Sequence, residues 1–347
     1  MSKYRISLII VIIVAAVAGI LYLLYSTKKE TVQPATTLKS NNIDLKKDTV
    51  TSVEPAAEQT APIYLKISSF QSYPSIAAMN EVEKTIRQQL PLLNITQRYL
   101  LLEQWEKALT PMINRLAPEQ QQILAIYKSF TNTSYLAGES SEAYSKRINT
   151  ALPAKLNPAQ KILFQQLTAR QIEITEAEEQ EPAFELKPAY WKNLFASRLT
   201  AGDQYYWNQQ TIENNAVIDY DAGLAVDRVT LGEWASSWES YLKKYPEGHY
   251  QKEAEEKYRN YMSYLLVGLE NTPTLNLETY KIEPDVIKDF ETIIKRHPNS
   301  TVANSITSFR KTIQDAEGKI NIAPKLYELA NTLTSEAPFI KKISVKP

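Results

Sequence analysis

The chain has 347 residues, of which 44% are hydrophobic and 22% are charged, enough for one large or two modest globular units. Lys and Arg together number 39, as do Asp and Glu, so the formal net charge is zero and no global field favours binding of nucleic acid. The absence of cysteine excludes disulfides, thiol nucleophiles, cysteine metal ligands and a lipid anchor attached through an N-terminal cysteine. Glycines number only 8, whereas Ala, Leu, Gln, Glu and Lys are frequent, so the composition predicts an all-α protein.

An uncharged apolar run, 6–25, follows a short basic flank, 1–5. A helix of this length rises about 30 Å and matches the hydrocarbon core of a bilayer, which predicts one membrane-spanning anchor. The Ala-Val-Ala at 16–18 has the form of a signal-peptide cleavage site, but the apolar run continues beyond it. The rest of the chain follows the anchor, so we expect a cytoplasmic N-terminus, a single pass through the inner membrane and a periplasmic body. Ala15 and Gly19 would let two spans pack closely, a route to a homo-oligomer.

The next stretch, 26–62, is rich in Thr, Lys, Pro and Asn, poor in aromatic residues and without sustained apolar periodicity. This composition predicts a disordered tether. A flexible chain of this length has an average end-to-end distance of about 30–35 Å. We therefore expect the body to stay near the membrane without being forced onto it.

From 63 to 210, apolar residues recur at helical spacing, which predicts an N-terminal helical subdomain that includes a helix over 157–180. Breaks fall at "LAP", "LNP" and "LKP", because proline cannot continue a helix but suits the first turn of the next one. The β-branched residues of 211–230 predict a short hairpin or an irregular loop. We expect this segment to connect the first subdomain to a C-terminal helical subdomain, 231–347.

The C-terminal subdomain contains an internal repeat. "SYLKKYPEGHY" at 240–250 and "TIIKRHPNSTV" at 292–302 align at a constant offset of 52 residues. In each copy the apolar side chains recur at i, i+3, i+4 and i+7, one face of a helix, and a proline then ends that helix. The matched residues are Trp238, Tyr241, Leu242 and Tyr245 in the first copy and Phe290, Ile293, Ile294 and His297 in the second. The pattern predicts repeated helix–turn–helix units, which bury their apolar faces by stacking.

This repeat resembles the aromatic-x-x-hydrophobic-x-x-x-Tyr-Pro-x-Ser unit of tetratricopeptide-like repeats in bacterial envelope proteins, including the outer-membrane assembly lipoproteins. The resemblance covers about 234–315. The period is 52 residues in place of the usual 34, and His297 replaces Tyr245 in the second copy. The resemblance implies a concave, helix-lined surface that holds peptides or partner proteins in the cell envelope, and it carries no catalytic residue.

Aromatic side chains are the candidate binding residues, because rigid rings in a groove anchor peptides. The candidates are Tyr205, Tyr206, Trp207, Tyr258 and Tyr261. Their helical spacing also predicts packing in the core. Three consecutive rings at 205–207 cannot all face one core, so we expect at least one to point outward and this cluster to be the surface anchor.

Few residues are suited to catalysis or metal binding. The chain has two histidines and no HExxH, GxxxxGK[ST] or GxGxxG motif, so we expect no metal, no cofactor and no catalysis. Glu173, Glu176 and Glu179, at steps of three, have the ligand type of a hard cation site, although a solvated helix face explains them better. One enzyme alternative needs no histidine: a glycan hydrolase or lyase acting on peptidoglycan, with Glu139 as the candidate acid.

The sequence thus favours a membrane-anchored adaptor or scaffold that binds envelope proteins or peptides through its periplasmic body, without nucleic acid. The alternatives are the glycan-active enzyme and a membrane-tethered periplasmic chaperone. A chaperone would bind many unfolded clients weakly through the same aromatic surface.

Overall fold

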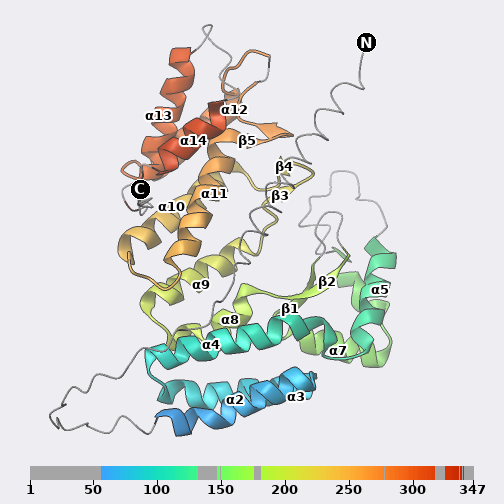
Figure 1. Ribbon diagram of the computed structural model, residues 1–347. Coiled ribbons are helices and arrows are strands. Elements are labelled where there is room, and N and C mark those ends of the chain that lie inside the picture. The colour runs from blue at the N-terminus through green and yellow to red at the C-terminus, as the bar shows by residue number, and fades with distance from the viewer. Residues whose placement is uncertain are drawn as a thin grey trace, which may run out of the picture. The chain divides into compact units, whose positions relative to one another are not determined.

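The computed structural model describes residues 56–131, 147–148, 150–175, 181–276, 278–316, 325–335, 337 and 339. This part is mostly helical, with short strands in three antiparallel pairs, which confirms the predicted all-α class (Figure 1). The α-helices are α2 (Ala56–Ser72), α3 (Ile76–Gln89), α4 (Ile95–Leu109), α5 (Glu119–Thr131), α7 (Pro158–Thr168), α8 (Pro188–Leu194), α9 (Ala201–Glu213), α10 (Arg228–Lys244), α11 (Gln251–Val267), α12 (Pro284–Arg296), α13 (Thr301–Ala316) and α14 (Leu326–Ser335). The 3₁₀ turns are η1 (Leu90–Leu92), η2 (Thr110–Arg115), η3 (Leu152–Ala154) and η4 (Ala196–Arg198). The strands are β1 (Ile172–Thr175), β2 (Ala183–Leu186), β3 (Asp219–Tyr220), β4 (Gly223–Leu224), β5 (Gly268–Leu269) and β6 (Thr272–Pro273).

The predicted anchor, 6–25, lies outside the described residues, as do Ala15 and Gly19 and most of the predicted tether. Within the part that is described, no helix combines the length and the apolar character needed to cross a bilayer.

The first described helix, α2, begins inside the stretch predicted as a tether. It starts at Ala56, so 56–62 are helical. Ile63, Ile67 and Phe70 are buried at i, i+4 and i+7 and pack α2 against α3 and α4. The predicted boundary was drawn where the Thr-, Lys- and Pro-rich composition ends. The Ala, Glu and Gln residues just upstream are good helix formers and extend the helix toward the N-terminus.

Side-chain caps explain where several helices begin. Asn94, Asn157 and Thr200 each start a helix with a capping box, in which the cap side chain and the side chain three residues later satisfy each other's backbone N–H groups. Pro158 and Pro188 occupy the first turns of α7 and α8. The helix starts predicted at these two prolines are confirmed.

The helix predicted over 157–180 is shorter, and a strand follows it. α7 ends at Thr168, and Gln171, in the left-handed region at φ 61°, redirects the chain into β1. β1 pairs with β2, and the register places Ile174 opposite Phe184, both buried. The four residues of β1 alternate between buried and half-buried positions, the period of a strand, and three of them are β-branched. Over four residues this alternation was too short to separate from the helical pattern before it.

The segment between α9 and α10, predicted as a short hairpin or a loop, contains the β3–β4 hairpin. Its turn residues Asp221 and Ala222 have φ 49° and 53°, the backbone of a type I′ turn. The β5–β6 hairpin meets it: Asn271 donates its N–H to the Ala222 carbonyl at 2.9 Å and its side-chain amide to the Asp221 carbonyl. Leu224 donates its N–H to the Thr272 hydroxyl at 2.9 Å. Each hairpin therefore braces the other.

Helix α10 is buried on nearly every side. It packs against α9, α11, α12 and α13 (Figure 1). Its buried residues are Leu231, Gly232, Trp234, Ala235, Ser236, Trp238, Glu239, Tyr241 and Leu242. A helix that is apolar on all sides is typical of a core. α9 packs against α10 across this segment, and the described residues from Ala56 onward belong to one compact unit.

The two stretches that align at an offset of 52 fold into two helix pairs, α10–α11 and α12–α13, with the same turn between the helices. The residue that caps the end of α10, Tyr245, has φ −129° and ψ 62°, and the residue that caps the end of α12, His297, has φ −127° and ψ 54°. Each of these two residues donates its N–H to the carbonyl four residues before it. Its own carbonyl accepts the N–H of the residue three positions later, at 2.9 Å for Tyr245 and 3.0 Å for His297. The shared sequence pattern thus corresponds to a shared backbone. α14 then packs on α11 and α13, the second helix of each pair.

Candidate functional site

The aromatic side chains predicted as binding anchors are mostly core residues. Tyr206 and Trp207 are each 8% exposed, Tyr258 is 0% and Tyr261 is 1% exposed. α9 lies between α8 and α10, so its consecutive rings point into different buried interfaces. Tyr205 is half-buried, and its hydroxyl donates to the main chain of α10 at 3.0 Å. The predicted surface anchor is therefore corrected: these side chains hold the helices together.

Glu213, at the end of α9, is the centre of a buried polar cluster. Its carboxylate accepts a hydrogen bond from the Trp238 indole N–H at 2.5 Å, one from the Tyr261 hydroxyl at 2.5 Å and one from the Gln209 amide at 2.9 Å. The Lys257 ammonium lies 3.4 Å from the same carboxylate. Burial, followed by the charge of Glu213, raises the pKa of Tyr261 well above its ordinary value. One carboxylate thus joins α9, α10 and α11.

A second buried carboxylate, Asp203, closes the capping box at the start of α9. Its Oδ2 accepts the Tyr99 hydroxyl at 2.5 Å and the Thr200 N–H and hydroxyl at 2.9 and 2.7 Å. Burial and the contact with Asp203 raise the pKa of Tyr99. The Tyr99 ring also stacks on His249 with centroids 4.0 Å apart. These contacts fix α4 to α9 and to the turn between α10 and α11.

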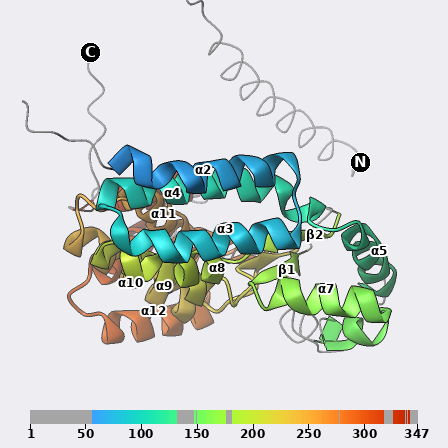
Figure 2. The same cartoon turned by 90° about the horizontal axis from the view of Figure 1, so that it is seen from below.

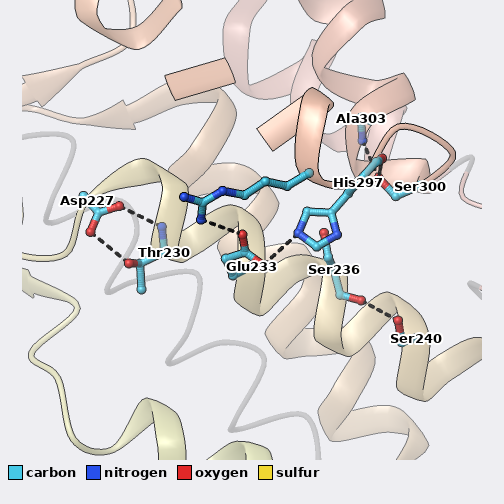
Figure 3. A network of polar contacts seen from close by, with 9 residues as sticks. Asp227, Thr230, Glu233, Ser236, Ser240, His297, Ser300 and Ala303 are labelled. Atoms are coloured by element: carbon cyan, nitrogen blue, oxygen red, sulfur yellow. Dashed lines mark hydrogen bonds and ion pairs between the residues drawn. The ribbon is translucent and has the colours of Figure 1, made fainter. Parts of the chain in front are cut away.

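A polar network joins α10 to the turn after α12 (Figure 3). The Glu233 carboxylate accepts a hydrogen bond from Arg296 at 3.0 Å and lies 2.7 Å from His297 Nε2. Burial raises the pKa of Glu233, but these two basic neighbours outweigh burial and hold the pKa below its ordinary value. Further along α10, the buried Glu239 pairs with Lys243 and accepts the first two N–H groups of α13 at 2.7 and 3.0 Å. The network secures one helix pair to the other.

The same contact region between α10 and the turn after α12 contains the residue types of a hydrolase triad: Ser236, His297 and Glu233. Ser236 is only 7% exposed, and its hydroxyl forms no hydrogen bond with His297 or with any other group in the described part of the chain. A serine nucleophile needs both a base within hydrogen-bond reach and access to substrate. The arrangement therefore supports packing of the helices and gives no support to acyl transfer.

The other chemical candidates are glutamate side chains. Glu139, Glu176 and Glu179 lie outside the described residues. Glu173 lies on β1 opposite Glu185 of β2. In the described ranges, no group of His, Asp and Glu side chains is arranged to hold a metal ion.

Three exposed apolar side chains follow one another closely in the sequence, from the end of α9 to the first hairpin, and we name them the hairpin patch. Ile212, Val217 and Tyr220 are 56%, 43% and 47% exposed, at the end of α9 and the start of the β3–β4 hairpin. The hydrogen bonds between the two hairpins hold this part of the backbone, and Tyr264 donates its hydroxyl to Asp219 at 3.1 Å. Clustered exposed apolar side chains mark interaction surfaces, and a braced backbone lowers the entropy lost when a partner binds.

Sequence reasoning missed the hairpin patch because it placed the binding surface on aromatic residues. The available signal was the group of β-branched residues between α9 and α10, which predicted the hairpin itself. The second hairpin, 268–273, which braces the β3–β4 turn, comes from a distant part of the sequence.

Comparison with known proteins finds no matching family model, no matching curated protein and no matching solved structure.

Proposed function

We propose that this chain is a membrane-anchored adaptor of the cell envelope whose periplasmic helical body binds a partner protein through the hairpin patch. The observation that carries the proposal is the exposure of Ile212, Val217 and Tyr220 on a backbone braced by two hairpins. Catalysis has no part in this function.

The apolar run at 6–25 supports the membrane anchor, because its length suits one bilayer crossing and charged residues flank it on both sides. The stretch that follows has the composition of a tether. In this arrangement the body reaches partners in the periplasm while the chain stays in the inner membrane.

The shared turn of α10–α11 and α12–α13 supports a tetratricopeptide-like repeat array. Such arrays serve as rigid frames for protein binding. Here the aromatic faces of the first pair are buried, so the partner binds the edge formed by α9 and the hairpins.

In-cell crosslinking, pull-down and mass spectrometry on the full-length protein test the proposal. The test variant is Ile212→Ser/Val217→Ser/Tyr220→Ser, which replaces the whole patch. The matched control, Leu65→Ser/Tyr73→Ser, replaces side chains of α2 and its end that are 71% and 80% exposed. Loss of one anchoring side chain at a hot spot costs at least about 2 kcal/mol, or roughly thirtyfold in affinity.

We expect a short set of envelope proteins that the control retains and the patch variant loses. An unchanged set in the patch variant, or the same loss in both variants, would contradict the hairpin patch as the binding surface. A broad set of unfolded proteins would favour a chaperone. The absence of any protein partner, together with cleavage of purified peptidoglycan, would favour the glycan-active enzyme.

A further inference from the structure

Two stretches that are far apart in the sequence contain basic residues and no Asp or Glu, although the whole chain carries 39 of each charge. The first stretch, 84–102, runs from α3 into α4, and the second, 186–202, runs through α8 and η4. We name their basic residues the basic face: Lys84, Arg87, Arg98, Lys187, Lys192 and Arg198. A separation of charge of this kind in a chain of zero net charge concentrates positive potential at one place.

The fold brings the two stretches together. α3 lies beside α8 (Figure 2). Arg87 donates to the Asn193 carbonyl at 3.3 Å, and Arg98 donates to the Arg198 carbonyl at 2.6 Å. These arginines hydrogen-bond backbone carbonyls and form no ion pair among the described residues.

One carboxyl group, that of Glu83, lies directly before the first stretch. Glu83 is half-buried and interacts with Tyr190. Burial raises the pKa of Glu83, while Tyr190 and the neighbouring arginines Arg170 and Arg87 lower it in part. Lys84 is exposed and Lys192 is half-buried, and neither forms an ion pair in the described part of the chain.

Exposed aliphatic side chains lie between these arginines. Leu92, in the turn between α3 and α4, is 73% exposed, and Ile95, the first residue of α4, is 40% exposed. Arg98 holds this turn by donating to the Leu90 carbonyl at 3.1 Å. An ordered turn that presents aliphatic side chains between basic residues combines the two requirements for binding at a membrane surface, apolar insertion and attraction to anionic headgroups.

We propose that the basic face, together with the exposed Leu92 and Ile95 of the chain between Arg87 and Arg98, docks the body onto anionic phospholipid at the surface of the membrane. The inference deepens the proposed function and rests on its tether for the position of the body beside the bilayer. Charge complementarity selects the partner, because an anionic bilayer offers both phosphate groups for the arginines and lysines and an apolar layer for Leu92. Docking leaves the hairpin patch for the protein partner.

The test uses the full-length chain, whose lack of cysteine permits one labelled position at a time. Leu92→Cys carries a polarity-sensitive fluorophore, and the matched control is Ile162→Cys on α7, another exposed aliphatic position at 57%. The protein is reconstituted into vesicles of phosphatidylcholine alone or with about 30% phosphatidylglycerol, at low and high salt. The charge-reversal variant is Lys84→Glu/Lys192→Glu, in the Leu92→Cys chain.

We expect the label at Leu92, and not the label at Ile162, to shift to the blue with phosphatidylglycerol at low salt. High salt and the charge-reversal variant should each abolish this shift. The charge-reversal variant should lower the ratio of docked to free protein by at least about tenfold. No shift at Leu92, an equal shift at Ile162, or an equal blue shift with soluble polyphosphate in place of lipid would overturn the docking.

Flotation with phosphatidylcholine vesicles at high salt tests separately whether the membrane anchor holds the chain on the vesicle. A protein that floats but shows no shift at Leu92 has a membrane anchor and no docking face. A protein that does not float, yet shows a lipid-dependent shift at Leu92, supports the docking and contradicts the anchor of the proposed function.

Discussion

Replacing Glu213 with Ala removes the shared acceptor of the buried cluster that joins α9, α10 and α11. The indole N–H of Trp238 and the hydroxyl of Tyr261 would lose their partner at positions only 0% and 1% exposed. Each buried donor left without an acceptor costs about 1–3 kcal/mol, and removal of one partner of a buried charged pair costs about 3–5 kcal/mol. Lys257, 3.4 Å from the carboxylate, would also lose its counter-charge. We expect Glu213→Ala to lower the free energy of unfolding by about 3–5 kcal/mol.

Urea unfolding of the full-length protein in detergent, followed by circular dichroism and tryptophan fluorescence, measures this loss. Glu213→Gln keeps one acceptor oxygen and should cost less than half as much. Tyr261→Phe should destabilise the wild type clearly but add little to Glu213→Ala, because it removes one of the orphaned donors. A loss below about 1 kcal/mol for Glu213→Ala, or simple additivity of the two changes, would refute the reasoning.

Three further predictions concern backbone geometry and pH. Gly268→Ala should cost about 2–3 kcal/mol by urea unfolding, because its φ of 79° and its close backbone neighbours exclude a Cβ, whereas Gly223→Ala, with no neighbour nearer than 3.4 Å, should cost little. Ala222→Gly should raise the free energy of unfolding by about 1 kcal/mol, and with it the melting temperature, because glycine adopts the positive φ of 53° without strain. An unchanged melting temperature would count against strain at this turn. The pKa of Glu233 is held below its ordinary value, so its stabilising effect is present above the unfolded-state pKa and is lost as pH falls through the folded-state pKa. The difference in melting temperature between wild type and Glu233→Gln should therefore be present above the ordinary carboxyl pKa of about 4.3 and shrink as the pH falls below it, and a difference independent of pH would contradict the contacts with Arg296 and His297.

Local signals in the sequence predicted much of the fold. Asn157 and Pro158 began a helix where the pattern placed one, because cap and first-turn chemistry act over a few residues. The alignment at an offset of 52 residues predicted repeated helix–turn–helix units, and the two turns have nearly the same backbone angles at Tyr245 and His297. β1 was missed because four alternating residues directly after a helix carry too little periodicity to be distinguished from its continuation.

The candidate site was harder to predict because burial depends on neighbours that are distant in the sequence. Tyr206 became a core residue through its stack on Tyr250, with centroids 4.0 Å apart, which no pattern within α9 reveals. The turn of the β3–β4 hairpin is braced by Asn271, which belongs to the other hairpin. The basic face likewise exists only because α3 lies beside α8.

Site-specific photocrosslinking tests the central claim most directly. A benzophenone amino acid replaces Ile212 in the hairpin patch of the full-length protein, and in a separate chain it replaces Leu65, which is 71% exposed on α2. After irradiation of living cells, the account predicts one or a few discrete adducts with envelope proteins from position 212 and none of these from position 65. No discrete adduct from position 212, or the same adducts from both positions, would contradict an adaptor that binds through the hairpin patch.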